Sequence, residues 1–424
     1  MNGPPSEPWI LRIPNEILHH IFSLLRLSAV QPFVKYELNG KEYEVSQMLV
    51  LRSVCRHFRA IVTESNFWCL DSFRFRDLVP PRYVTKDCSR EREFLKVLFS
   101  DENLADSVGR RKTDWTFGSR DEVMAILDGV PLFVQNARKI QLRPSGPARL
   151  DATLDAATAC SNITSLSTLL TDSIDLSGIA ASFPSLTSLS CMETRDFHGS
   201  LESLGHLQEL CLSVGWAKSK PGPIDRSWLP MRSAGTLTTL ELLFREADTD
   251  DTPFFDTDSL NAFVNLKILT VEPLNESCCK FIARAPIQLE VFYITLSPSQ
   301  LPFHVFVEML RADSLHNLKE LGISTSCNYE TTDLDRPDIV QYWSLIFDAF
   351  TSMLPSVQTV DINTPFHVKW WPYFGRMVNI KRLSCYPNPH FGTGDSEDPR
   401  AEIAEKLSAA FANFMETPEI EINL

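Results

Sequence analysis

The sequence lacks any run of about 18 apolar residues, which is roughly the length that a membrane-spanning helix needs. Its first residues, MNGPPSEPWILRIP, lack the basic and apolar regions of a secretory signal. Positive charge is also scarce, because 40 Lys and Arg face 54 Asp and Glu and leave a net charge of -14. An acidic chain repels phosphate backbones, so we expect neither a membrane nor nucleic acid among the partners.

The CxxC motif of metal-binding and redox cysteines is absent as well. The ten cysteines include no CxxC pair, and the adjacent Cys278 and Cys279 are poorly placed to bind one metal ion. Several cysteines lie inside apolar patterns, as buried thiols do. We therefore predict reduced thiols, no metal site, and a location in the cytoplasm or the nucleus.

Motifs of catalysis are missing too: the sequence has no GxSxG, no P-loop and no HExxH. The acidic stretch 248–258 has Pro253 and Ser259 where a calcium-binding EF-hand loop needs Gly and Glu, so we interpret it as an exposed loop. We predict no cofactor and no enzymatic activity. One aromatic cluster either packs in the core or forms an exposed protein-binding hot spot: Trp370, Trp371, Tyr373 and Phe374.

Two short apolar segments, residues 13–25 and 51–61, are predicted to be helices. Pro14 and Glu16 suit the first turn of a helix. Both segments have apolar faces wider than the two helices could bury against each other. Either they pack on the rest of the chain as an N-terminal cap, or one face is kept for a partner.

The order of residues in these segments resembles an F-box. The family pattern has a Leu-Pro-x-Glu start, an Ile-Phe one turn on, a Val-Cys-Arg core and a late Trp; here Ile13 replaces the first Leu. The resemblance implies docking on the Skp adaptor of a Skp/cullin/F-box ubiquitin ligase and, through it, on a cullin. By position, the residues that would divide between F-box core and adaptor interface are Pro14, Ile17, Leu18, Ile21, Phe22, Leu51, Val54, Cys55, Phe58 and Trp68.

Between Leu25 and Met48 the chain is longer than that family usually allows. Asn39-Gly40, in the stretch FVKYELNGKEYEV, is a strong signal for a two-residue hairpin turn. The turn would place Val34 opposite Val45, Lys35 opposite Glu44, Tyr36 opposite Tyr43 and Leu38 opposite Lys41. The apolar side of this hairpin packs on the protein, widens the adaptor interface or obstructs it.

Residues 71–135 are expected to form a connector with helices at 89–99 and 119–129. The second helix has a capping box, Ser119 with Glu122, and Gly129 as its stop. We interpret residues 109–118 as a loop and its basic run, Arg110-Arg111-Lys112, as an exposed surface.

From about residue 136 the pattern LxxLxL recurs. Successive copies between Leu186 and Ile380 start 21 to 39 residues apart, and three share the flanks NLKIL, NLKEL and NIKRL. The pattern resembles degenerate leucine-rich repeats, like those that follow F-boxes, although the ladder Asn or Cys is missing. The copies begin at Ala137, Leu186, Leu207, Leu237, Leu266, Leu289, Leu318, Val357 and Ile380.

These patterns predict an α/β fold. A small all-helical F-box head, residues 9–70 with a hairpin insertion at about 31–46, precedes the connector 71–135 and a leucine-rich-repeat solenoid over 136–424. Strand and helix alternate at a spacing that builds a parallel concave sheet with outer helices, closed by a strand in TPEIEINL. The alternative is an ordinary α/β domain.

The predicted function is substrate recognition without catalysis. The head would dock on the adaptor, and the repeats would hold a protein substrate for ubiquitin transfer. The alternative is a leucine-rich-repeat scaffold that acts outside a ubiquitin ligase. Which protein is bound does not follow from the sequence, because repeat solenoids keep their fold while their surfaces vary.

The predicted substrate-binding residues are acidic. Side chains alternate across a strand, so residues beside the buried leucines share the open face of the sheet. We hypothesise that these carboxylates attract a basic segment of the substrate; the alternative is that exposed strand positions are simply polar. The five residues are Glu209, Glu241, Glu272, Glu320 and Asp361.

The predicted hairpin should be dispensable for folding, because it is an insertion with its own turn and its own paired strands. Replacing residues 34–45 by a short Gly/Ser loop should leave the midpoint of urea denaturation nearly unchanged. A loss of several kcal/mol would mean that its apolar side belongs to the core. Weaker adaptor binding at unchanged stability would mean that the hairpin extends the interface.

Overall fold

The computed structural model describes fifteen stretches of the chain, which fall into two compact units. The first unit is Met1–Asp172 with Ser182–Leu186, and the second is Ser173–Ala181 with Thr187–Leu424. In the described stretches no helix has the length and apolar character needed to cross a membrane. These stretches are 17–18, 33–38, 41–46, 56–63, 95–130, 132–143, 150–160, 162–214, 228–244, 262–296, 301–325, 337–366, 370–377, 379–387 and 419–422.

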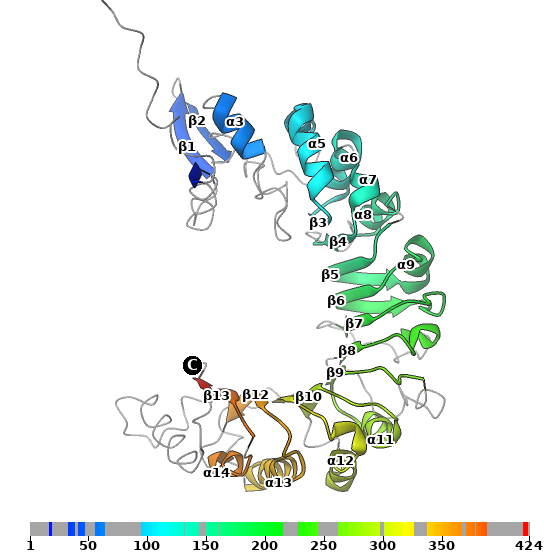
Figure 1. Cartoon of the computed structure of the whole chain (residues 1–424), viewed down its shortest axis with the longest axis vertical. Helices are drawn as coiled ribbons and strands as arrows, with labels where there is room; N and C mark the ends of the chain where they lie inside the picture. The colour runs from blue at the N-terminus through cyan, green and yellow to red at the C-terminus, as the bar shows by residue number, and fades with distance from the viewer. Residues whose placement is uncertain are drawn as a thin grey trace, which may run out of the picture. The chain divides into compact units, whose positions relative to one another are not determined.

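The first unit begins with a hairpin and continues with alternating helices and strands (Figure 1). Strands β3, β4 and β5 are parallel neighbours in chain order. The elements are β1 (Phe33–Leu38), β2 (Lys41–Ser46), α3 (Arg56–Thr63), α5 (Glu102–Arg111), β3 (Asp114–Phe117), α6 (Arg120–Gly129), α7 (Phe133–Asn136), β4 (Lys139–Leu142), α8 (Leu150–Ala157) and most of β5 (Ser165–Asp175).

The second unit begins within β5 and contains most of α9 (Leu176–Ser182). Its strands then follow one another, each parallel to the next: β6 (Ser188–His198), β7 (Glu209–Val214), β8 (Thr239–Phe244), β9 (Ile268–Glu272), β10 (Val291–Leu296), β11 (Glu320–Thr325), β12 (Thr359–Phe366), β13 (Arg382–Pro387) and β14 (Glu419–Ile422).

Helices cover one face of this parallel sheet, and Figure 1 shows them together on the side away from the open strand face. They are α11 (Glu276–Arg284), α12 (Phe303–Leu310), α13 (Pro337–Met353) and α14 (Trp371–Phe374), with the short 3-10 helices η7 (Met231–Ser233) and η8 (Asp313–Leu315). The predicted fold class, an α/β solenoid with a parallel sheet and outer helices, is confirmed. The predicted closing strand is β14.

The LxxLxL leucines form the core of the second unit. The middle position of each copy pairs with the middle position of the next, so the copies stack in register. Each of these side chains is at most 1% exposed. Burying one such side chain stabilises the fold by roughly 1.5–3 kcal/mol. The aligned residues are Leu189, Leu210, Leu240, Leu269, Phe292, Leu321, Val360 and Leu383.

Residues 109–118 are not the loop that the sequence suggested. They contain the end of α5 and the strand β3, whose Trp115 pairs in register with Ile140. Lys112 stands where other copies carry the first Leu, and it is 1% exposed, with its ammonium 5.5 Å from the centre of the Trp115 ring. The interpretation of the basic run as an exposed surface is therefore wrong for Lys112, because its stem packs in the core.

Strand β5 carries a further copy that the pattern search missed. Leu166 pairs with Ile140 and Thr168 pairs with Leu142, so Ile163-x-x-Leu166-x-Thr168 continues the repeat. Thr168 is fully buried although it is polar. A threonine at the third position breaks an apolar pattern without breaking the strand, because β-branched residues suit strands.

The other predicted helices are confirmed where they are described. Helix α6 begins after Ser119, whose Oγ accepts a hydrogen bond from the Glu122 N–H at 3.3 Å, and it ends at Gly129. A Cβ at Gly129 would lie 2.9 Å from the Cβ of Phe99, so close packing requires glycine there. Residues 95–99, the second half of the first predicted connector helix, are also helical.

Buried serines link one repeat to the preceding one. Ser233, at the end of η7, accepts a hydrogen bond from the Leu207 N–H at 3.1 Å and donates to the Leu204 carbonyl at 2.5 Å. In η8, Ser314 donates to the Ile282 carbonyl at 2.7 Å. Both serines stand four residues before the first Leu of their copy, and their hydroxyls bond to backbone groups of residues that precede them by 26 to 32 positions.

Hydrogen bonds of asparagines explain the first residue of the shared flanks NLKIL, NLKEL and NIKRL. The Asn265 amide donates to the Gly235 carbonyl at 2.6 Å, and the Asn379 amide donates to the Pro355 carbonyl at 2.5 Å. Asn317 donates instead to the Gln288 side-chain oxygen at 2.7 Å. These three asparagines lie just before β9, β11 and β13, and each bonds to a residue that precedes an earlier strand.

Removing the Ser233 hydroxyl should loosen the contact between two repeats. Ser233→Ala leaves the buried Leu207 N–H without its acceptor, which should cost about 1–3 kcal/mol of unfolding free energy. Hydrogen exchange at Leu207 and urea denaturation measure the effect. The matched control is Ser203→Ala, which changes the exposed serine at the same repeat position. Equal effects of both variants would contradict the role of Ser233.

Candidate functional site

Of the ten predicted adaptor-binding residues, three lie in described stretches, and the structure separates them. Leu18 is 2% exposed and Phe58 is 4% exposed, so both belong to the core. The neighbouring Ile17 is 50% exposed. The sequence could not make this division because all three fit the same apolar pattern. The other seven lie outside the described residues: Pro14, Ile21, Phe22, Leu51, Val54, Cys55 and Trp68.

The hairpin has the predicted register. Strands β1 and β2 pair Val34 with Val45 and Lys35 with Glu44, and Asn39-Gly40 connects them. The turn signal was sufficient to fix this register, since a two-residue loop leaves one way to align the strands.

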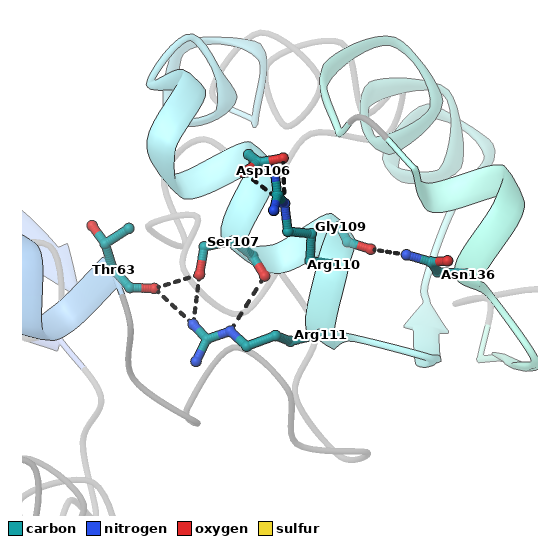
Figure 2. Close-up of polar contacts among 7 residues, drawn as sticks. All are labelled: Thr63, Asp106, Ser107, Gly109, Arg110, Arg111 and Asn136. Carbon is teal, nitrogen blue, oxygen red and sulfur yellow. Dashed lines mark hydrogen bonds and ion pairs between the residues drawn. The ribbon is translucent and has the colours of Figure 1, made fainter.

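Helix α3 ends on a cluster of hydrogen bonds to α5 (Figure 2). The Thr63 carbonyl accepts from the Ser107 hydroxyl and from Arg111 Nη2, both at 3.1 Å. Arg111 Nη2 also donates to Ser107 Oγ at 2.6 Å. A carbonyl in the last turn of a helix has no intrahelical partner, and a cation is favoured at this negative end of the helix dipole. Arg111 therefore caps α3.

A second contact extends the connection. The Asn136 amide, at the end of α7, donates to the Gly109 carbonyl of α5 at 2.8 Å (Figure 2). Helix α5 is thus bound to α3 on one side and to α7 on the other. Arg110, by contrast, forms only the exposed ion pair with Asp106 at 2.9 Å that a spacing of four residues allows.

The five predicted acidic residues lie on the open strand face, where buried and half-exposed residues alternate along β8 and β9. They do not form one row. Glu209 and Glu320 begin their strands, Glu241 and Asp361 occupy the next outward position, and Glu272 lies one position further. Within the described sheet no two of them pair directly, so the register separates the carboxylates from one another along the face.

The row from Glu241 to Asp361 passes through Thr270, Tyr293 and Gly322. Tyr293 is half-buried, and its ring occupies the space above Gly322: a Cβ there would lie 1.8 Å from Tyr293 Cδ1. The Tyr293 hydroxyl donates to Glu320. Glycine inside a strand often marks such a close approach, and this signal could have identified the pair from the sequence.

Burial and the hydrogen bond to Glu320 raise the pKa of Tyr293, to which the charge of Asp361 adds. The phenol therefore stays protonated and remains a donor to Glu320. Two half-exposed aliphatic residues complete this part of the face: Val291 precedes Tyr293 by two positions, and Ile268 pairs with Val291. Sequence reasoning missed them because it followed only the carboxylates.

Several cysteines are buried thiols, as their apolar context predicted. Burial raises the pKa of Cys278 to about 12 and that of Cys160 to about 11. Thiols that stay protonated are poor nucleophiles and poor metal ligands. In the part of the chain that the structure describes, no group of three or more His, Cys, Asp or Glu could hold a metal ion.

Two members of the aromatic cluster belong to the core. Trp370 and Phe374 are fully buried, with ring centroids 5.2 and 5.5 Å from that of Phe347. Tyr373 is half-exposed, with Arg376 5.2 Å from its ring centre. The packing interpretation therefore holds for Trp370 and Phe374.

The acidic stretch 248–258 lies outside the described residues.

Comparison with known families identifies an F-box-like domain at residues 10–69. A search of the curated proteins gives no match. Solved structures with similarity include the yeast Rad7–Elc1 complex, at 13% identity over 74% of this chain and 87% of that chain, with a TM-score of 0.43. An internalin, InlF, of Listeria monocytogenes shows 12% identity over 79% of this chain and 94% of that chain, with a TM-score of 0.35.

The cap on α3 can be tested with two neighbouring arginines. Arg111→Ala removes the hydrogen bonds to Thr63 and Ser107, so hydrogen exchange of the α3 amides should accelerate, corresponding to a loss of about 1.5–3 kcal/mol for bonds to a charged group. Arg110→Ala is the matched control and should change exchange little, because exposed ion pairs contribute about 0–1 kcal/mol. Unchanged α3 exchange in Arg111→Ala would refute the cap.

Proposed function

We propose that the protein is a non-catalytic substrate-recognition subunit of a Skp/cullin/F-box ubiquitin ligase. The F-box-like domain would dock on a Skp-type adaptor and, through it, on a cullin. The repeats, which we assign to the leucine-rich class, would hold a protein substrate for ubiquitin transfer by other subunits. The proposal rests above all on the match of residues 10–69 to the F-box-like family, and the exposure of Ile17 within them adds to it.

The exposure of Ile17 supports docking through this helix. Leu18 and Phe58 are buried, whereas half of the Ile17 side chain is exposed, so Ile17 is the one of the three that a partner can cover. When a partner covers an exposed isoleucine, the complex is stabilised by roughly 25 cal/mol for each Å² of apolar surface buried. The adaptor is the partner that the F-box-like match suggests.

The connection between α3 and α5 supports the proposal in a second way. A substrate receptor must hold its docking domain steadily against the rest of the chain, because ubiquitin transfer depends on where the substrate is presented. The hydrogen bonds of Arg111 and Ser107 to Thr63 would provide this on the side of the first repeats. We place the protein in the cytoplasm or the nucleus, where such ligases would act.

The open strand face is the proposed substrate surface. Its outward positions combine Glu209, Glu241, Glu272, Glu320 and Asp361 with small polar residues, which suits a basic protein segment. Salt should weaken such binding, because exposed charges are screened beyond about 10 Å at 0.1 M ionic strength.

A scaffold that acts outside a ligase is the second candidate. The hairpin of β1 and β2 favours it, because this insertion lies inside the F-box-like match at residues 10–69. If the hairpin covers the docking surface, the repeats would still bind partners while the adaptor would not. Co-purification of adaptor and cullin with the full chain distinguishes the two candidates.

Changing Ile17 should abolish adaptor binding without unfolding the protein. Ile17→Asp places a carboxylate in an apolar interface, so affinity for a purified Skp-type adaptor should fall at least about tenfold, measured by calorimetry. The matched control is Val264→Asp, which makes the same kind of change at a residue of the second unit that is 48% exposed.

Leu18→Asp completes the series. Leu18 is buried, so this variant should unfold the head and be detected by circular dichroism and protease sensitivity. Native binding by Ile17→Asp would refute docking through this helix, and unfolding of Ile17→Asp would mean that the segment is only structural.

A further inference from the structure

We propose that Tyr293 is the anchor of a docking surface for a basic segment of a protein partner, with a lysine or arginine side chain lying on its ring. We call this surface the Tyr293 platform and define it by Tyr293, Gly322, Val291, Ile268 and the carboxylates around them. The proposal rests on the proposed function only in taking the partner to be the substrate.

The ring is held in one place. It lies over Gly322, the one position in that row where the absence of a Cβ leaves room for it, and its hydroxyl is fixed by Glu320. The backbone below covers part of the ring while the side chain as a whole stays half-exposed. An aromatic ring with an accessible face attracts cations through its quadrupole, and a fixed ring loses little entropy when it binds.

Carboxylates lie on both sides of the ring along the sheet. Glu241 lies two strands before Tyr293 and Asp361 two strands after it, and Glu320 touches its hydroxyl. With neighbouring strands about 4.8 Å apart, the ring over Gly322 lies about 5 Å from the strand of Asp361 and about 14 Å from the strand of Glu241. A cation on the ring would therefore have negative charge on both sides.

The nearest described cations do not occupy this position. Lys267 and Lys319 both pair with Glu290, at 3.0 and 2.6 Å, just before their strands begin. Arg382 lies two strands beyond Gly322, opposite Thr359. Its charge lowers the pKa of Tyr293, but less than the charges of Glu320 and Asp361 raise it. Glu320 and Asp361 therefore act more strongly on the Tyr293 hydroxyl than Arg382 does.

Aliphatic residues narrow the kind of partner further. Val291 and Ile268 are adjacent across β10 and β9 and half-exposed on the same face as Tyr293. Interfaces commonly have an apolar or aromatic centre with a polar rim. The segment that fits this surface therefore carries an aliphatic side chain next to its lysine or arginine, and a purely basic tail would use only half of the surface.

The test uses the full chain and fluorescein-labelled peptides. The probe is a short peptide of repeated Leu-Arg-Ser; its controls carry Glu for Arg, or Ser for Leu. Fluorescence anisotropy should show binding of the first peptide and at least about tenfold weaker binding of both controls. Affinity should also fall as NaCl rises from about 0.1 M to about 1 M, where the screening length drops from about 10 to about 3 Å.

Three variants assign the effect to the ring. Tyr293→Leu keeps apolar bulk but removes the aromatic face, and should weaken binding about fivefold. Tyr293→Phe keeps the face and should bind more tightly than Tyr293→Leu. Gly322→Ala displaces the ring without changing it and should weaken binding as Tyr293→Leu does. The double variant Gly322→Ala/Tyr293→Leu should show no further loss, because both changes remove the same contact.

Several results would overturn the proposal: equal binding of the Arg and Glu peptides, no binding of the Arg peptide by the native chain, native affinity in Tyr293→Leu, or additive losses in the double variant. Thr359→Ala, an outward change two strands away, controls for general effects on the face. Adaptor binding is measured in parallel. If the native chain does not bind the adaptor, the ligase assignment is refuted, while the result with the peptides still stands.

Discussion

The alignment of one apolar position from strand to strand is the constraint on which the rest of the molecule depends. In a parallel sheet a shift by one residue would turn every inward side chain outward, so the stacked middle positions of the second unit fix the faces of its strands at once. The helices can then vary in length and number. The outward residues are arranged by the same register, and this is why Tyr293 lies beside Gly322 and Glu241 does not lie beside Glu272.

Much of this arrangement could be predicted from the sequence because it depends on local or repeated signals. The dipeptide Asn39-Gly40 predicted the hairpin register, and the recurring LxxLxL pattern predicted the strands. The predictions failed where a polar residue occupies a position that the other copies fill with an apolar residue. Lys112 and Thr168 occupy core positions of the repeat although both are polar, and a search for apolar spacing cannot recognise them.

The candidate sites were harder to predict for a different reason. Whether Ile17 or Leu18 faces solvent depends on what the rest of the head covers, and the two are neighbours in one apolar pattern. Arg111 is indistinguishable from Arg110 in the sequence, yet one caps a helix 48 residues earlier in the chain and the other does not. The carboxylates were visible, but their separation by Thr270, Tyr293 and Gly322 follows only from which strand neighbours which.

The serine of η7 has a consequence for how the solenoid would come apart. Ser233 holds two backbone groups of the repeat before it, and no described hydrogen bond of its side chain reaches beyond that repeat. When each repeat is bound mainly to its neighbours, unfolding that starts at one junction spreads first to the adjacent repeats. Distant repeats remain folded meanwhile. Segments of very different length can therefore be inserted between units during evolution, since each insertion disturbs only the junction that it enters.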